Sequence, residues 1–389
     1  MLALWGLLLV PMCAAAHFGD SKHPVEPKEI LTWNSQQKLQ GFRSYAEIFP
    51  TRAIIAGASV YPLTADNHDF SNLTYQVGDE HFSVDSFVRK TRVAGMIVVH
   101  RNRVVHERYE LGADASTRWV SYSVAKSIVS MLFGAAIADG YISNVNDSVT
   151  AYLPRLTGGA YDGVSIKQLL QMSSGVRWRE DYVDSKADVS QSPSEILALI
   201  DYMQALPRAA EPGTRFNYST GETNLAGAVL RAAIGNNLAT YLTHKIWRPF
   251  GMEGDANWML GAPGGAEYGG CCISASLRDY ARVGLFAMGG GKAADGSPIL
   301  PLDWMTQSTT PSPHNPGYGY FWWLRPNGAY AAVGIFGQLI WIDPASQTVI
   351  AIHSAWPQAS SQSLSAHRWA LVDALARAVE SRASASMVQ

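Results

Sequence analysis

Residues 119–132 read WVSYSVAKSIVSML, and this stretch decides how the rest of the chain is interpreted. Small polar residues crowd its start, and an apolar run with helical spacing follows. The pattern predicts a helix over 122–139 that ends at Gly140. One lysine, Lys126, lies where the apolar face of this helix begins. Because burying a lysine costs free energy, its position beside several serines indicates a role other than packing.

Ser123 and Lys126 lie three residues apart, which places them on one face of a helix. The helix N-terminus and partial desolvation both favour loss of the lysine proton, so the amine becomes a base for the neighbouring hydroxyl. The pair therefore predicts nucleophilic catalysis by serine. The pattern alone is weak, since Ser35 and Lys38 also match it in a polar segment with no apolar helix behind it. The alternative is a helix cap at Ser123 and a solvent-reaching Lys126.

Two later stretches supply further candidates for catalysis. Residues 211–230, EPGTRFNYSTGETNLAGAVL, place Tyr218 between a Pro-Gly turn and a helix, where a phenol relays protons if a nearby cation lowers its pKa. Residues 333–343, VGIFGQLIWID, place Gly334 and Gly337 in a predicted strand, where glycine marks close approach of a backbone or ligand. A backbone N–H exposed there forms half of an oxyanion hole. Turn packing for Tyr218 and a simple β-bulge for the glycines remain alternatives.

In chain order, SVAK, YST and GIFG resemble the three motifs of the serine β-lactamase and penicillin-binding-protein superfamily, in its class C β-lactamase-like part. The stretches LLQMSSGVRWREDY, GGCCISASLRDYARVG and QLIWIDPASQTVIAIHSAW are similar to the branch of esterases and 6-aminohexanoate-dimer hydrolases. The resemblance covers roughly residues 50–380. It implies an α+β fold with a β-lactamase/DD-peptidase-like antiparallel sheet built from both chain ends, flanked by helices, and an inserted, mainly helical lobe.

The order of predicted elements agrees with this fold. Alternating strands from Ala94, joined at 101–103, predict one hairpin, and the stretch around PASQ predicts a second hairpin late in the chain. Helical patterns dominate about residues 145–290, and SLSAHRWALVDALARAVES predicts a closing helix. We therefore expect an N-terminal arm over 17–50 that is polar and irregular, and a hydrolase domain over 51–385.

The resemblance also implies roles for individual residues. Ser123 is the implied acylated nucleophile, Lys126 its base and Tyr218 the proton relay to the leaving group. The backbone N–H groups of Ser123 and Gln338 are the implied oxyanion hole. Since no dedicated deacylating glutamate is evident, deacylation is expected to use Lys126 and Tyr218 again.

Two motif positions depart from the superfamily pattern. Thr220 replaces an asparagine that usually contacts a substrate amide, and Ile335 replaces a lysine or histidine that helps hold a carboxylate. We therefore expect small neutral esters and linear amides to be preferred over β-lactams. Substrate contacts are expected at Ile335, Gly337 and Tyr182, although Tyr182 also fits simple packing. The aromatic residues expected to line an apolar cleft with Tyr182 are Trp178, Trp322, Trp323 and Trp356.

Composition excludes several other classes of function. Lys and Arg number 30 against 32 Asp and Glu, with no basic block, so no nucleic-acid partner is expected. No Cys-x-x-Cys or His-Glu-x-x-His pattern is present, so neither a metal nor another cofactor is expected. Cys271 and Cys272 are neighbours, which strains a bridge between them, so we expect small apolar strand residues.

The first residues, MLALWGLLLVPMCAAA, have the features of an export signal. Their apolar run is too short to span a bilayer and is followed by small residues. We therefore expect a signal peptide over 1–16, a periplasmic or secreted protein, and no transmembrane segment after signal removal. An uncleaved anchor or a buried segment is the alternative.

Three hypotheses about function follow. The first is a serine hydrolase that cleaves a small-molecule amide or ester through an acyl-enzyme. The second is a penicillin-binding or peptidoglycan-interacting protein that is acylated by its ligand but releases it slowly. The third is a catalytically idle relative, and the intact set of Ser123, Lys126 and Tyr218 argues against it.

Overall fold

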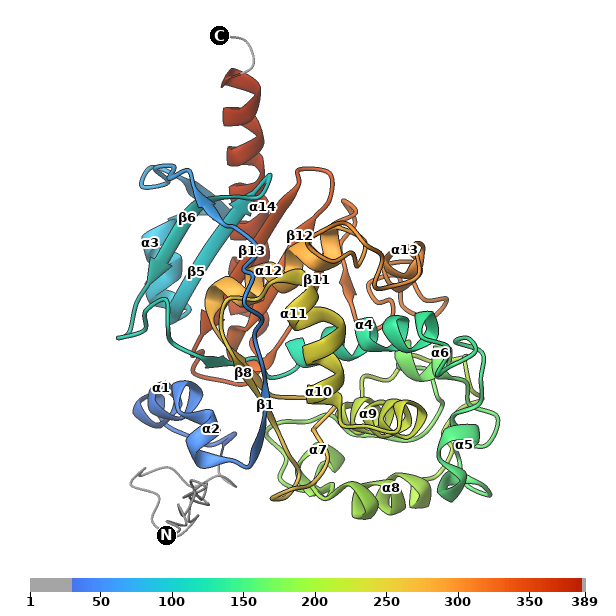
Figure 1. The fold of residues 1–389 in the computed structure, drawn as a ribbon. Helices are drawn as coiled ribbons and strands as arrows, with labels where there is room; N and C mark the ends of the chain where they lie inside the picture. Colours follow the sequence, from blue (N-terminus) through green and yellow to red (C-terminus); the bar gives the residue numbers. More distant parts are fainter. Residues whose placement is uncertain (1–29, 387–389) are drawn as a thin grey trace, which may run out of the picture.

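The structure, a computed structural model, describes residues 30–386 and has an α+β architecture (Figure 1). Its largest sheet has seven strands in the order β10-β11-β12-β13-β5-β6-β2. Three of these strands come from the first part of the chain: β2 (Thr64–Ala65), β5 (Val93–His100) and β6 (Arg103–Tyr109). The other four come from its end: β10 (Trp323–Leu324), β11 (Tyr330–Val333), β12 (Leu339–Asp343) and β13 (Thr348–Ser354). The expected sheet built from both chain ends is confirmed.

The pairing of this sheet is antiparallel except between β2 and β6. Both predicted hairpins are present. β5 and β6 are joined by Arg101 and Asn102, whose φ angles of 49° and 64° suit a tight hairpin turn. β5 is buried along its whole length instead of alternating between buried and exposed residues, because β13 and β6 flank it and both sheet faces are covered.

Side chains alternate between the two faces of the sheet and build two separate cores. Ile97 and Val99 point into a core shared with helices α4 (Val124–Ala138) and α12 (Leu277–Met288). Met96 and Val98 point to the other face, where α3 (Val84–Lys90) and α14 (Gln362–Ser386) cover them. In Figure 1, α14 runs along the sheet beside β5 and β13. Helix α14 therefore covers one face of the large sheet.

A lobe of helices follows α4. Its helices are α5 (Val149–Tyr152), η2 (Pro154–Leu156), α6 (Ile166–Leu170), α7 (Asp188–Gln191), α8 (Ile196–Ala205), α9 (Thr220–Ile234), α10 (Leu238–Leu242), η3 (Thr243–Trp247) and α11 (Arg248–Phe250). The lobe was expected to reach about residue 290. It ends near α11, because α12 packs on β13, β12 and β5 of the large sheet. A further short helix, α13 (Trp304–Ser308), packs against α4.

The N-terminal arm is more ordered than expected. The expected signal peptide at 1–16 and the start of the arm lie outside the described residues. From Asn34, which caps its first turn, the chain forms α1 (Ser35–Arg43) and α2 (Tyr45–Ile48). Phe42 and Tyr45 are buried in an aromatic core together with Tyr122 and Phe336. The sequence analysis did not predict this core, because polar residues surround Phe42 and Tyr45 along the chain.

Two smaller sheets complete the fold. One has the order β1-β8-β9-β7, with β1 (Thr51–Ile54), β8 (Ala256–Met259), β9 (Ile273–Ala275) and β7 (Trp119–Val120). The other pairs β3 (Thr74–Val77) with β4 (Glu80–Ser83). Strand β7 leads directly into the segment that holds Ser123 and Lys126.

Candidate active site

Ser123 is the N-cap residue of α4, and its side chain makes no capping hydrogen bond. The helix begins at Val124, later than the predicted start at Tyr122, because Tyr122 adopts a φ of 45° that interrupts the helical backbone. A left-handed backbone at an aromatic residue is costly and is characteristic of functional sites. Ser123 thus stands at the cap position without capping the helix through its side chain, and its hydroxyl contacts Lys126 instead.

Lys126 is buried, and its hydrogen-bond partners among residues 30–386 are all oxygen atoms that carry no charge. Its Nζ atom lies 3.2 Å from Ser123 Oγ, 3.0 Å from Thr220 Oγ1 and 2.8 Å from the Gly270 carbonyl oxygen. A Cβ atom on Gly270 would lie 3.1 Å from Nζ and 2.9 Å from Thr220 Cγ2, so glycine permits this close approach. Burial lowers the pKa of Lys126 to about 8, and the Glu180 carboxylate opposes this shift.

Glu180 is a charged residue of the site that the sequence analysis missed. Its carboxylate accepts hydrogen bonds from the Thr220 backbone N–H at 2.9 Å, from the Thr220 hydroxyl and from the Tyr182 hydroxyl at 2.7 Å. The Trp178 indole N–H donates to it as well. Glu180 stands two residues before Tyr182 in the stretch WREDY. Its closeness to Tyr182, which was already a predicted site residue, could have identified it from the sequence. Thr220, in place of the usual asparagine, links Lys126 to this carboxylate.

Tyr218 lies beside Lys126, whose Nζ is 5.4 Å from the centre of the phenol ring. Its ring also stacks on Trp323, with centres 5.6 Å apart. Burial, and then the Glu180 charge, raise the pKa of Tyr218, while the Ser123 side chain opposes the shift. The condition under which the sequence analysis assigned Tyr218 a relay role, a pKa lowered by a nearby cation, is therefore not met. The phenol therefore keeps its proton at neutral pH.

The third motif forms a turn between two strands, whereas the sequence predicted that its glycines lie within a strand. β11 ends at Val333, the short helix η4 (Ile335–Gly337) follows, and β12 begins at Leu339. Gly337 has a φ of 93°, and a Cβ atom there would overlap the Trp356 indole, so no other residue fits. The strand breaks here because two glycines and a left-handed Phe336 (φ 58°) cannot continue a regular ladder.

Gln338 holds this turn in place. Its buried side chain donates to the Ser354 carbonyl oxygen at 2.7 Å and accepts from the Ser354 N–H at 3.1 Å. A Cβ atom on Gly334 would overlap the Ser121 carbonyl oxygen, so the turn lies against the residues before Ser123. Within residues 30–386, neither the Ser123 N–H nor the Gln338 N–H donates to a protein acceptor. Their pairing as an oxyanion hole stays a prediction.

A cavity of about 300 Å³ opens above Ser123. It brings together most of the predicted site residues, namely Ser123, Tyr182, Tyr218, Ile335, Trp323 and Trp356. Lys126, Gly337 and Gln338 are not among its lining residues. Trp178 and Trp322 were expected to line the cavity but do not. Trp322 is fully buried, and the Trp178 indole N–H donates a hydrogen bond to Glu180. Glu180 and Arg368, which the sequence analysis did not select, contribute the charged part of the lining.

The second Ser-x-x-Lys match does not form a site. It lies on helix α1 instead of in irregular chain, because Asn34 supplies a cap for this helix. Lys38 donates to the Pro357 carbonyl oxygen, and Ser35 is exposed. The two side chains are therefore used separately, in contrast to Ser123 and Lys126.

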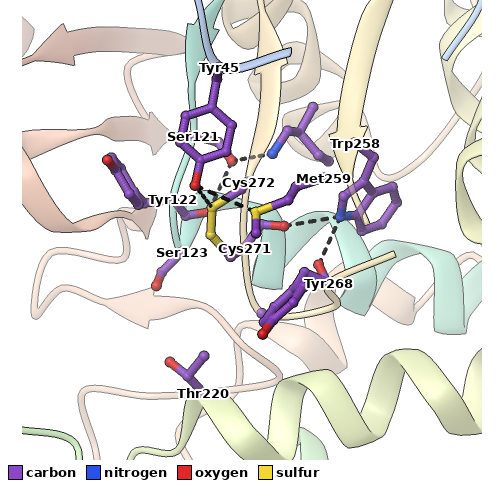
Figure 2. The surroundings of a disulfide bond; sticks show 12 residues. Tyr45, Ser121, Tyr122, Ser123, Thr220, Trp258, Met259, Tyr268, Cys271 and Cys272 are labelled. Atoms are coloured by element: carbon purple, nitrogen blue, oxygen red, sulfur yellow. Dashed lines mark hydrogen bonds between the residues drawn. A yellow bond between two sulfur atoms is a disulfide. The ribbon is translucent and has the colours of Figure 1, made fainter. Parts of the chain in front are cut away.

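Cys271 and Cys272 form a disulfide, which overturns the expectation of two apolar strand residues (Figure 2). They lie in a turn before β9, and the positive φ of Cys272 (85°) is part of that turn. The Tyr45 hydroxyl donates to Cys272 Sγ at 3.4 Å, and the Trp258 indole N–H donates to the Cys271 carbonyl oxygen at 3.0 Å. The pair directly follows the Gly270 carbonyl that binds Lys126.

Among the described residues, no group of three or more His, Cys, Asp or Glu side chains is arranged to hold a metal ion. None of the helices between residues 30 and 386 combines the length and apolarity needed to cross a bilayer.

The residues of this site lie within a segment that matches a known protein family. The family model described as Beta-lactamase matches residues 83–374, which include the complete set of site residues above. The chain belongs to the beta-lactamase family. The superfamily resemblance seen in the three motifs is thereby confirmed.

Beta-lactamase family relatives include proteins named for hydrolysis of other bonds. The 6-aminohexanoate-dimer hydrolase of Paenarthrobacter ureafaciens is 28% identical over 296 residues, which cover 69% of this chain and 74% of that protein. A Bacillus anthracis structure provisionally named 6-aminohexanoate-dimer hydrolase has a TM-score of 0.79 at 20% identity, over 89% of this chain and 95% of that one. A family VIII carboxylesterase has a TM-score of 0.57 at 17% identity, over 71% of this chain and 91% of that one. The chain is thus a hydrolase of the beta-lactamase superfamily, and these structures share its fold.

Proposed function

We propose that this protein is a serine hydrolase that cleaves an amide or ester through an acyl-enzyme on Ser123. The observation that carries the proposal is the 3.2 Å contact between Ser123 Oγ and Nζ of Lys126, a buried amine with a pKa of about 8. With this pKa, about a tenth of the amines are neutral at pH 7 and about half at pH 8, far more than for an ordinary lysine. Lys126 therefore supplies a base in direct contact with the nucleophile.

The hydrogen bonds around Lys126 support its orientation as a base. A neutral amine has two N–H groups and one lone pair. The Gly270 carbonyl oxygen only accepts, and the Thr220 hydroxyl gives its own proton to Glu180, so both oxygens take N–H groups of Lys126. The lone pair is left for the third neighbour, the Ser123 hydroxyl. Glu180 and Thr220 are in this view positioning residues, which act through Lys126.

Acylation follows from this arrangement. Ser123 Oγ attacks the substrate carbonyl carbon while its proton passes to Lys126 Nζ. The carbonyl oxygen becomes an oxyanion, for which the N–H groups of Ser123 and Gln338 are the proposed donors. When the intermediate collapses, the bond to the leaving oxygen or nitrogen breaks, and that atom takes a proton from the Tyr218 phenol, which recovers one from Lys126. The products are the acyl-enzyme and a free alcohol or amine.

Deacylation reverses these roles. A water molecule attacks the acyl carbon and gives its proton to Lys126 or Tyr218. The bond from the carbon to Ser123 Oγ then breaks, Oγ regains a proton, and the carboxylic acid is released. The same groups thus serve both halves of the cycle. A carboxylesterase and a dimer hydrolase among the compared proteins support ester and linear amide bonds as the classes to test.

A substrate panel with covalent labelling tests this function. We expect turnover of para-nitrophenyl butyrate or of ω-amino-acid amides, and faster turnover of these than of a chromogenic cephalosporin. A fluorophosphonate should add one label by intact mass, and Ser123→Ala should lose both the label and turnover. Ser35→Ala is the matched control, because Ser35 has the same motif spacing but is exposed on α1.

The outcomes separate the competing hypotheses. Labelling of Ser123→Ala at the normal rate would remove Ser123 from the mechanism. Stoichiometric labelling of the normal protein by its substrate without turnover would instead support the covalent binder.

A further inference from the structure

Three buried aromatic side chains meet beside the two backbone segments of the proposed oxyanion hole, and one of them comes from the N-terminal arm. Phe42 of α1 lies 5.2 Å from Tyr122 and 5.3 Å from Phe336, measured between ring centres. The rings of Tyr122 and Phe336 are themselves 5.3 Å apart, and all three residues are 0% to 3% exposed. Phe42 therefore contacts both the segment before Ser123 and the turn of the third motif.

The two rings that Phe42 contacts belong to residues with a costly backbone conformation. Tyr122 has a φ of 45° and Phe336 a φ of 58°, both in the left-handed region. Such conformations persist where the surrounding structure enforces them. Tyr122 directly precedes Ser123, so its backbone angles orient the peptide group that carries the Ser123 N–H. Phe336 stands two residues before Gln338 and shapes the turn that presents the Gln338 N–H.

Helix α1 is fixed to the rest of the fold by polar contacts as well. Arg43 at its end donates to the Leu111 carbonyl oxygen at 2.7 Å. Lys38 on the same helix is 4% exposed and donates to the Pro357 carbonyl oxygen. The Lys38 Nζ atom lies 4.8 Å from the centre of the Phe336 ring. Helix α1 therefore contacts Phe336 twice, through an aromatic ring and through a buried cation.

We propose that α1 is part of the active site and that Phe42 is a positioning residue, which sets the spacing between the N–H groups of Ser123 and Gln338. Donors of an oxyanion hole must lie about 2.7–3.1 Å from the developing oxyanion, so a small displacement of either segment weakens the hole. Because Phe42 contacts both segments at once, its ring fixes one relative to the other. The inference rests on the proposed function, since the oxyanion forms when Ser123 attacks the substrate.

A pair of esters that differ in one atom tests this role. We compare para-nitrophenyl butyrate with para-nitrophenyl thionobutyrate, in which sulfur replaces the carbonyl oxygen. Sulfur is a weak hydrogen-bond acceptor, so the thionoester gains little from an oxyanion hole. Both esters need the same nucleophile, base and leaving group. The ratio of their kcat/KM values, oxygen ester over thionoester, therefore reports on the two N–H donors, and a change that slows both reactions equally leaves it unaltered.

Phe42→Leu should lower this ratio by about tenfold. Loss of a whole donor costs about a hundredfold or more, and a displaced donor keeps part of its effect. Phe87→Leu is the matched control, because Phe87 is equally buried but lies on α3 at the other face of the large sheet. This control should lower the melting temperature and leave the ratio unchanged. If Phe42→Leu does not fold, Lys38→Met decides in its place, since it keeps the three rings, removes the cation over Phe336 and should lower the ratio too.

Two results would overturn the role of Phe42. The first is an unchanged ratio in folded Phe42→Leu, or in Lys38→Met where Phe42→Leu does not fold. The second is an equal fall of the ratio in Phe87→Leu, which would indicate a general loosening of the fold. Absence of para-nitrophenyl butyrate turnover by the normal protein would instead count against the proposed function itself. It is distinguishable, because both results above require measurable turnover.

Discussion

The hydroxyl of Thr220 links Lys126 to Glu180 by hydrogen bonds. Thr220 Oγ1 lies 3.0 Å from Lys126 Nζ and donates its proton to the Glu180 carboxylate. The carboxylate therefore raises the pKa of the lysine without being bonded to it, while burial lowers that pKa to about 8. This arrangement keeps the pKa of the buried amine close to the pH at which the amine would act as a base.

Replacing Lys126 by arginine should remove activity and keep the fold. Arginine stays protonated and cannot accept the Ser123 proton. We expect kcat/KM for para-nitrophenyl butyrate to fall by about a thousandfold or more. Circular dichroism should be unchanged, and the exposed Lys90→Arg serves as control. Near-normal turnover in Lys126→Arg would show that this lysine is structural.

Activity should rise with pH through about 8. The neutral form of Lys126 is the base, so the active fraction increases as pH passes the lowered pKa and levels off above it. The measurement is kcat/KM for an ester between about pH 6 and pH 10, corrected for spontaneous hydrolysis. A profile that is flat across this range would contradict the role of Lys126 as base.

Glu180→Gln should move that rising limb to lower pH. The glutamine removes the negative charge that raises the pKa of Lys126, so the amine loses its proton more readily. The plateau rate should also fall, because a glutamine amide can donate to Thr220 and disturb its hydrogen bonds to Lys126. The neighbouring exposed Asp181→Asn is the matched control and should leave the limb in place. A loss of rate without any shift would indicate a purely structural Glu180.

Tyr218→Phe should affect amides more than aryl esters. The raised pKa of Tyr218 keeps its proton available, and an amine leaving group needs that proton whereas para-nitrophenolate leaves without it. We expect the ratio of amidase to esterase kcat/KM to fall by about tenfold or more. Equal losses on both substrates would rule out a leaving-group role and leave activation of Ser123 or packing.

The parts of the site that could be predicted depend on short spacing. Ser123 and Lys126 are paired by the helical repeat, and Tyr218 was found because a Pro-Gly turn precedes its helix. The same spacing at Ser35 and Lys38 was a false match, and it also lies on a helix. What separates the two copies is tertiary burial, which local spacing does not contain.

The sequence by itself determined the superfamily, the two hairpins and the pairing of Ser123 with Lys126, because each is set by motifs or by the helical and strand repeats. Only the tertiary structure decided that Thr220 and Glu180 reach Lys126, and that Arg368 of α14 meets Ile335 at one cavity. These contacts join segments that are distant along the chain. The packing of α14 on the sheet and of α9 against α4 sets them, and neither follows from local periodicity.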